Sequence, residues 1–367
     1  MKKILILCLS LFLFTGCHVR QRTRQVDPPI TIDTNYFKDD NCYLYHYETL
    51  SKKDKEIYQD IYNCLLGHEK KVTVASDDYA TVQEINSCVL YDHPEIFYFD
   101  YFELEKQVDN THYVPTYVYS KSEVNELNDQ LETIRNDFIN SLDQNASDYD
   151  KLKSIYDFVI TKCQYVDGAI DNQDITSVLL YGQTVCSGYA KAVKYLSEPL
   201  GLDVAYLVGQ DITDDEEGDY HAWNLVYLDN DYYYLDATWG DYDSDGITFT
   251  MYGYFMFDSN DMLKLYKPEG EYKTTTTGQY CYYKYENLYS DTYNKNNLSP
   301  MIKQYKNSST TWMELKFSDS CYQEAKRRLI DQEEMFTLFD RYTDRAYSVS
   351  YFSYDDLNVL IFNQIIE

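Results

Sequence analysis

Residues 183–239 constrain the fold of this chain more than any other stretch. Cys186 stands just before a run in which apolar residues recur at the three- and four-residue spacing of a helix. Pro199 and Gly201 stop that pattern, so a helix is predicted to begin at or near Cys186 and to end before Gly201. The unpaired N–H groups and the dipole of a helix N-terminus favour negative charge. A thiol placed there loses its proton more easily, and the thiolate is its reactive form.

Two strands are predicted to follow this helix. His221 begins the first, and residues 232–239 form a second strand rich in aromatic side chains. The polar residues 229–231 between them indicate a turn and therefore an antiparallel hairpin. His221 and Asp236 share a face of this hairpin only if the numbers of opposed residues add up to an odd sum. A two- or four-residue loop meets this condition, whereas a three-residue loop meets it only with a bulge.

Cys186, His221 and Asp236 have the chemistry of an activated nucleophile. A thiol needs a base that takes its proton, and the base needs a group that fixes its orientation. If the hairpin has the required register, Asp236 bonds one nitrogen of His221 while the other nitrogen faces Cys186. A cysteine and a histidine alone would be a weak pattern. The three residues together, on a helix start, a strand start and the next strand, predict a catalytic triad.

Three short sequences in this stretch resemble the transglutaminase-like superfamily. They are Val-Cys-Ser-Gly-Tyr-Ala at 185–190, His-Ala-Trp-Asn at 221–224 and Tyr-Leu-Asp-Ala-Thr-Trp at 234–239. The microbial and kyphoscoliosis/cytokinesis branch is more similar to them than the animal crosslinking enzymes are. The resemblance implies an α+β fold with a papain-like transglutaminase core. In that core a helix carrying Cys186 packs on an antiparallel sheet carrying His221 and Asp236.

The resemblance also bears on the groups around the triad. The animal enzymes use an upstream Trp near the oxyanion, but no Trp precedes Trp223 in this chain. We therefore expect the backbone N–H of Cys186, together with the side chain of Gln183, to stabilise the oxyanion. Trp223 and Trp239 are expected to lie in the core or in the walls of the pocket.

Members of this superfamily are protein crosslinkers, peptidases, amidases and proteins without known activity. The resemblance therefore implies thiol-dependent acyl transfer or amide hydrolysis on a peptide or protein, including cell-wall peptides, with no cofactor. The sequence leaves open whether water or an amine completes the reaction. It also leaves open a non-catalytic surface binding or scaffold protein that keeps the fold.

Residues 1–17 have the features of a bacterial secretory signal. Two lysines precede an apolar run that ends in small residues and is too short for a spanning helix. Phe-Thr-Gly-Cys at 14–17 resembles a lipobox, which implies cleavage before Cys17 and attachment of lipid to its sulfur. The protein is then expected on the outer face of the bacterial cell membrane. Residues 18–35, which carry three arginines and two prolines, are predicted to be a flexible tether.

Charge and residue spacing argue against several classes of partner. The net charge of −29 excludes a nucleic-acid-binding protein, which needs a basic surface. Residues 241–246 match the first half of a calcium loop, but Tyr252 stands where such a loop needs a carboxylate, so a turn is predicted instead. No cysteine spacing matches a metal pattern, and the sequence predicts no metal site. Six further cysteines are expected to be mostly buried free thiols: Cys42, Cys64, Cys88, Cys163, Cys281 and Cys321.

The periodicity of the remaining sequence predicts small α+β units on both sides of a catalytic domain at 121–290. Residues 36–120 are predicted to form the first and residues 299–367 a β-α-β-β unit. His93 precedes a proline at a predicted helix end, where a capping or loop role is expected. The predicted helices cover 51–67, 78–91, 121–144, 147–163 and 320–333, and the predicted strands outside the hairpin include 71–75, 96–105, 112–119, 203–208, 310–317, 347–352 and 358–365.

Overall fold

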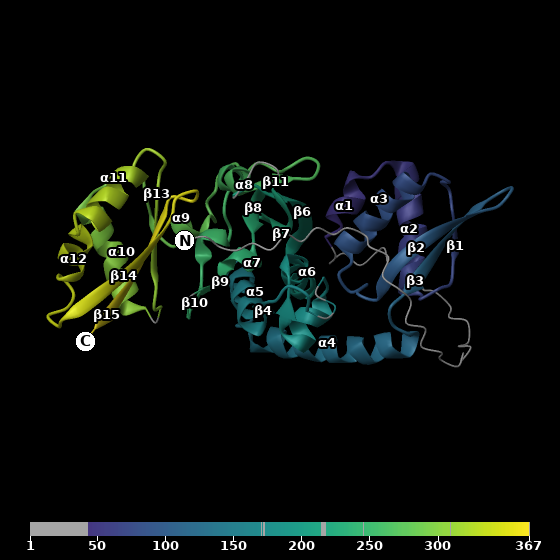
Figure 1. Ribbon diagram of the computed structural model, residues 1–367, viewed down its shortest axis with the longest axis horizontal. Helices are drawn as coiled ribbons and strands as arrows, with labels where there is room; N and C mark the ends of the chain where they lie inside the picture. The colour runs from purple at the N-terminus through teal and green to yellow at the C-terminus, as the bar shows by residue number, and fades with distance from the viewer. Residues whose placement is uncertain are drawn as a thin grey trace.

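The computed structural model describes residues 43–366, with the exception of 170, 172, 214–217, 245 and 309. The predicted signal segment, Cys17, the tether and Cys42 lie outside the described residues. The protein has an α+β fold, as predicted, and its helices and strands form three units in a row (Figure 1). The N-terminal unit lies at one end, the unit that carries Cys186 in the middle, and the C-terminal unit at the other end.

The N-terminal unit consists of three helices beside a three-stranded antiparallel sheet with the order β1-β3-β2. Ser51 and Asp78 cap its two longer helices, because each side chain accepts a hydrogen bond from the backbone N–H three residues later. His93 is the residue that ends α3, where its backbone N–H donates to Val89. Its elements are α1 (Tyr45–Thr49), α2 (Lys52–Leu66), β1 (Val72–Val74), α3 (Tyr79–Asp92), β2 (Phe99–Lys106) and β3 (Thr111–Tyr117).

A long helix, α4 (Lys121–Ser141), runs from the N-terminal unit along the edge of the middle unit (Figure 1). Ser120 and Glu123 form a capping box at its start. The middle unit that follows contains α5 (Asp148–Lys162), β4 (Gln164–Tyr165), β5 (Gln183–Thr184), α6 (Cys186–Ser197), β6 (Asp203–Asp211), β7 (Asp219–Leu228), β8 (Asp231–Leu235), α7 (Ala237–Gly240), β9 (Asp241–Ser244), β10 (Ile247–Thr250), α8 (Ser259–Leu265), β11 (Tyr266–Pro268) and α9 (Tyr282–Tyr285).

A four-stranded antiparallel sheet, in the order β11-β6-β7-β8, forms the centre of the middle unit. Leu228 pairs with Asp231, so the β7–β8 hairpin has a two-residue loop of Asp229 and Asn230. Both loop residues have positive φ, at 51° and 63°, which suits the right-handed twist of the two strands. This register gives the odd sum that the sequence required and confirms the predicted hairpin.

The second strand of the hairpin is shorter than predicted. β8 ends at Leu235, and residues 237–240 form the single helical turn α7 instead of more strand. The physical reason is a cap, since the Asp236 carboxylate accepts hydrogen bonds from the backbone N–H groups of Thr238 and Trp239. Asp236 therefore lies at the junction of a strand and a helix, where its backbone is fixed from both sides.

The C-terminal unit departs from the predicted β-α-β-β order. Its sheet has the order β12-β13-β15-β14, and the prediction missed β12 and two helices, α10 and α12. Pro300 lies inside α10, and proline is normally a sign that a helix has ended, which hid this helix in the sequence. The elements are β12 (Tyr289–Ser290), α10 (Lys295–Asn307), β13 (Met313–Phe317), α11 (Tyr322–Lys326), α12 (Glu334–Phe339), β14 (Tyr347–Tyr354) and β15 (Val359–Ile366).

A buried carboxylate joins the C-terminal unit to the middle unit. Glu314 of β13 is 4% exposed and accepts hydrogen bonds from the backbone of Tyr252 and the hydroxyl of Tyr283. Burial raises the pKa of Glu314 to about 7, although these hydrogen bonds act in the opposite direction. The contact between the two units therefore contains a group that titrates near neutral pH.

The N-terminal and middle units share one hydrophobic core. A single cluster contains Ile57 of α2, Leu131 of α4, Tyr156 of α5 and Val193 of α6. The C-terminal unit has a cluster of its own, which includes Leu315. The N-terminal unit is consequently packed against the helix that begins at Cys186. Among the residues that the structure describes, none of the helices has both the length and the apolar character needed to cross a bilayer.

Candidate active site

His221 and Asp236 form a buried hydrogen-bonded pair. His221 Nε2 lies 2.6 Å from Asp236 Oδ2, and the two residues are 7% and 1% exposed. The same Asp236 oxygen accepts from the hydroxyl of Tyr266 at 2.6 Å, while its second oxygen accepts from Thr238 N at 2.9 Å. The carboxylate is thus held by donors on both oxygens, and it fixes the orientation of the imidazole ring.

The structure brings Cys186 to the other side of this imidazole. Burial by itself lowers the pKa of His221, but the Asp236 carboxylate and the nearby Cys186 raise it well above its usual value. Because Nε2 is engaged by Asp236, Nδ1 is the nitrogen available to Cys186. The three residues singled out in the sequence therefore meet in one place, in the order thiol, imidazole and carboxylate.

Cys186 is the first residue of α6, as the sequence predicted. Val185 precedes it as the N-cap and supplies no side-chain cap, so the backbone N–H groups of the first turn are not satisfied in that way. These groups and the helix dipole place partial positive charge beside the thiol.

The other described cysteines have a different environment. Cys186 is half-buried and sits at the helix start beside His221, whereas burial raises the pKa of four other thiols to about 12. A thiol with such a pKa is unreactive at neutral pH. These four thiols are Cys64, Cys88, Cys163 and Cys281.

A chain of hydrogen bonds holds a loop against the start of α6. The Ser187 hydroxyl donates to the carbonyl of Gln173 at 3.0 Å, and Lys191 Nζ donates to the same oxygen at 2.9 Å. The Tyr206 hydroxyl lies 3.1 Å from Ser187 Oγ, and it must be the donor there because the serine proton is already used. Tyr206 is thereby committed to Ser187 and supports the loop beside Cys186.

Trp223 is part of the core beneath the site. Its ring is fully buried and stacks on the His221 ring at 6.0 Å and on Tyr266 at 4.6 Å between ring centroids. Gly209 pairs with His221 across β6 and β7, and a Cβ there would lie 2.7 Å from a Trp223 ring carbon. The sequence left open whether Trp223 lies in the core or in a wall of the pocket. The structure places it in the core.

Trp239 contacts the triad through its backbone, whose N–H donates to Asp236 Oδ1 at 3.3 Å. Trp239 is half-buried, and its indole Nε1 donates to Asp211 Oδ2 at 2.9 Å, which anchors the end of β6. Gln183 lies in β5 with an exposed side chain and pairs through its backbone with Gln164. Its predicted oxyanion role stays a prediction.

Sequence reasoning missed Tyr266 and Tyr206. Tyr266 reaches Asp236 from β11, and Tyr206 reaches Ser187 from β6. Both tyrosines belong to strands that read simply as structural, and no local motif sets them apart from the other tyrosines of the chain. Only the pairing of β6 with β11 and β7 brings them to the site.

The similarity of this chain to a known family lies in the middle unit. Residues 136–237 match the transglutaminase-like superfamily. This match includes Cys186, His221 and Asp236. It covers the middle unit up to the end of the hairpin and does not extend to the flanking units.

Individual relatives are distant. The kyphoscoliosis peptidase of Mus musculus is 26% identical over 149 residues, which cover 36% of this chain and 22% of the mouse protein. A solved structure described as a TGase has a TM-score of 0.27 at 16% identity, covering 46% of this chain and 50% of its own. A candidate cysteine protease from Cytophaga hutchinsonii has a TM-score of 0.26 at 14% identity, covering 38% of this chain and 61% of its own. This chain therefore spans only part of each relative.

Within the described ranges, no three His, Cys, Asp or Glu side chains are grouped as metal ligands would be. Asp241 and Asp243 of the acidic run lie in β9, where they pair with Thr250 and Thr248 of β10.

Proposed function

We propose that this protein is a thiol-dependent acyl-transfer enzyme of the transglutaminase-like type, acting on amide groups of peptides or proteins. In this proposal Cys186 is the nucleophile, His221 is the general base and acid, and Asp236 orients His221. The observation that carries it is the His221–Asp236 pair at 2.6 Å, with Cys186 close enough to the same imidazole to raise its pKa.

The reaction begins when His221 takes the proton of Cys186 and the thiolate attacks an amide carbonyl carbon. The oxyanion that forms is stabilised by the Cys186 backbone N–H at the uncapped start of α6. His221 then gives its proton to the nitrogen as the C–N bond breaks, and a thioester remains on Cys186. Water or an amine attacks that thioester, passes a proton to His221 and restores the thiol.

The choice between water and an amine separates a peptidase or amidase from a crosslinker. Both share every step up to the thioester, so the residues of the triad support them equally. Incubation with peptides, primary amines and cell-wall fragments, followed by mass spectrometry, distinguishes the products. A free carboxylate formed by addition of water across the cleaved C–N bond indicates hydrolysis, whereas a product that joins the acyl group to the added amine indicates transfer. Cys186→Ala should form neither product.

We also propose that the protein acts at the outer face of the bacterial cell membrane, held there by lipid on Cys17. The signal-like segment and the Phe-Thr-Gly-Cys sequence at 14–17 support this location. The acidic composition, with a net charge of −29, suits an exported protein that does not bind nucleic acid.

The reactivity of the thiols tests the proposed chemistry without knowledge of the substrate. Iodoacetamide at pH 6 is expected to alkylate Cys186 far faster than the five other described cysteines, as followed by peptide mass spectrometry. His221→Ala should abolish this advantage, and His112→Ala, a histidine of β3 in the N-terminal unit, should leave it intact. The rate for Cys186 in the folded protein is compared with the rate for ordinary exposed thiols, measured on the denatured chain. Equal rates would instead favour a scaffold protein.

A further inference from the structure

The N-terminal unit contributes Tyr91 to the cluster against which the candidate nucleophile packs. Tyr91 and Cys186 both pack against the same small cluster, formed by Ala190, Tyr206, Val208 and Ala222. The ring centroids of Tyr91 and Tyr206 are 5.0 Å apart. A residue of α3, far from Cys186 in the sequence, thus packs against the same cluster as the thiol.

Tyr91 also takes part in a chain of side chains beside the triad. Its hydroxyl lies close to Tyr220, which is the residue before His221 and is 60% exposed. Tyr220 is close in turn to Glu269, just after β11, and burial together with these two neighbours raises the pKa of Tyr220. The three side chains connect the N-terminal unit to the sheet of the middle unit at the level of Cys186 and His221.

The position of Tyr91 is fixed by the next residue. Asp92 is fully buried and accepts three hydrogen bonds, from His46 N at 3.0 Å, Tyr47 N at 2.8 Å and the Tyr58 hydroxyl at 3.0 Å. Three donors on one buried carboxylate leave α3 little freedom at its C-terminal end.

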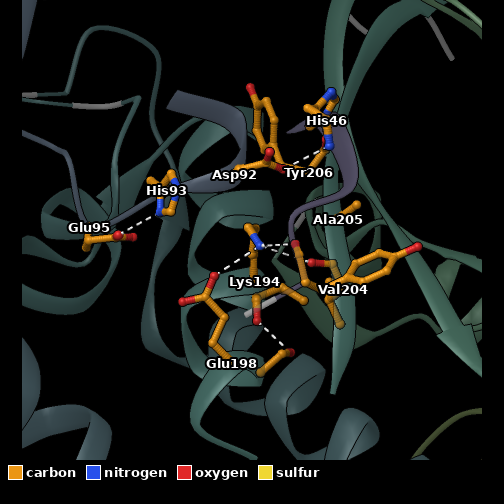
Figure 2. A network of polar contacts seen from close by, with 12 residues as sticks. His46, Asp92, His93, Glu95, Lys194, Glu198, Val204, Ala205 and Tyr206 are labelled. Carbon is orange, nitrogen blue, oxygen red and sulfur yellow. Dashed lines mark hydrogen bonds and ion pairs between the residues drawn. The ribbon is translucent and has the colours of Figure 1, made fainter. Parts of the chain in front are cut away.

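His46 connects the end of α3 to the middle unit. Its ring Nε2 donates to the carbonyl of Tyr206 at 2.7 Å (Figure 2). Its ring centroid lies 5.1 Å from that of Tyr91. Tyr91 is therefore placed by contacts on both sides of the boundary between the two units.

A second contact ties the nucleophile helix to the same unit. Lys194 of α6 is fully buried, and its Nζ donates to the carbonyls of Tyr43 at 3.1 Å and Val204 at 3.4 Å (Figure 2). It also forms an ion pair with Glu198 at 3.0 Å. Because a buried ammonium requires such partners, separation of the N-terminal unit would leave one of its hydrogen bonds unmade. These contacts fix the position of the N-terminal unit relative to α6.

From these contacts we propose that Tyr91 is a specificity-determining residue, which forms a wall of the substrate site at Cys186 and limits the bulk of the acyl group that reaches the thiol. Asp92 and His46 are the positioning residues that hold this wall. The inference rests on the proposed function, since it concerns the same thiol. It implies acyl donors that are slender beside the reacting carbonyl, and it makes the N-terminal unit part of the active site.

The test compares the reactions of a small and a bulky electrophile with the whole protein, and it does not require the natural substrate. The rates of Cys186 modification by iodoacetamide and by N-phenylmaleimide are measured by peptide mass spectrometry in the wild type and in Tyr91→Ala. The ratio of the bulky to the small rate is expected to rise about tenfold or more in Tyr91→Ala, in line with the effect of a methylene-sized change in a pocket. Tyr91→Phe, which keeps the ring and lacks only the hydroxyl, should change the ratio far less.

Two controls separate a wall from a general effect on folding. Tyr79→Ala removes an exposed tyrosine from the first turn of the same helix and should leave the ratio unchanged. Cys88, half-buried and one turn before Tyr91, reports any loosening of α3, because its own labelling would then rise as well. If Tyr91→Ala does not fold, Tyr91→Leu keeps apolar packing while it narrows the side chain and should still raise the ratio.

The outcomes distinguish the two proposals. An unchanged ratio in folded Tyr91→Ala and Tyr91→Leu, with fast alkylation of Cys186 that depends on His221, overturns the role of Tyr91 and leaves the proposed function standing. Slow alkylation that does not depend on His221 overturns the proposed function. A raised ratio with unchanged labelling of Cys88 supports the wall.

Discussion

Replacement of Asp236 by asparagine tests the link between the carboxylate and the thiol. Asn keeps an oxygen for the backbone N–H of Thr238, so the start of α7 retains its cap. Its amide NH₂ takes the place of the oxygen that faces His221 and Tyr266, and it donates where the carboxylate accepted. His221 Nε2 must then become an acceptor, which moves the ring proton to Nδ1, the nitrogen next to Cys186.

The magnitude follows from the bond that is lost. A hydrogen bond to a charged partner contributes about 2 kcal/mol. Its loss disfavours the imidazolium–thiolate pair and lowers the rate of iodoacetamide alkylation of Cys186 at pH 6 by about 30-fold. The pKa of His221, which Asp236 raises, should fall at the same time, as an NMR titration of the imidazole would show.

Asp241→Asn is the matched control for this experiment. Asp241 lies five residues further on and also accepts a tyrosine hydroxyl, from Tyr189 at 2.6 Å, but it has no contact with His221. Its replacement should leave the alkylation rate within about twofold of the wild type, because its hydrogen bond is to Tyr189 and sites that share no partner act independently. If Asp236→Asn is folded and alkylates as fast as the wild type, Asp236 does not orient a catalytic histidine, and the reasoning fails.

Three further predictions concern stability and location. The folded Glu314 carboxyl, with a pKa of about 7, binds its proton at a pH where the unfolded chain has lost it, above an ordinary value of 4.5. The contribution of Glu314 to the free energy of unfolding is therefore fully present below pH 4.5, and it falls by about 3 kcal/mol as the pH rises through 7. In Glu314→Gln, the free energy of unfolding from urea curves at pH 5 and pH 8 should depend less on pH. Gly209→Ala would place a Cβ 2.3 Å from the Lys267 carbonyl, and it should lower the free energy of unfolding by about 3 kcal/mol and reduce Cys186 alkylation. Cys17→Ser should move the protein from the membrane fraction to the soluble fraction after cell lysis; an unchanged distribution would contradict lipid attachment at Cys17.

Local sequence was sufficient for the elements that carry the three central residues. The helical spacing after Cys186 and the proline and glycine that follow it predict α6, and the polar residues 229–231 between two predicted strands predict the β7–β8 hairpin. The parity of the register could be stated in advance as a condition, but the loop length that satisfies it became known only from the structure. The end of β8 was missed because the Asp236 cap starts a helical turn in a segment whose aromatic residues favour a strand.

The C-terminal unit shows where local rules fail. α10 contains Pro300, which a local reading takes as the end of a helix, and its apolar face becomes visible only against the cluster that includes Leu298 and Ile302. β12 has two residues, too few for any pattern, and it exists because Ser290 pairs with Phe317 of β13. Tertiary contacts decided both elements.

The sequence by itself determined the chemistry of this protein's centre, because a thiol at a helix start, an imidazole and a carboxylate are residue types whose order and spacing can be read directly. The tertiary structure alone decided what surrounds them. Tyr266 bonds Asp236, Tyr206 bonds Ser187, and Tyr91 packs against the same cluster as Cys186. These tyrosines come from strands and a helix that are distant along the chain. The physical reason is that their roles depend on long-range strand pairing and on the docking of the N-terminal unit, and neither leaves a periodic trace in the local sequence.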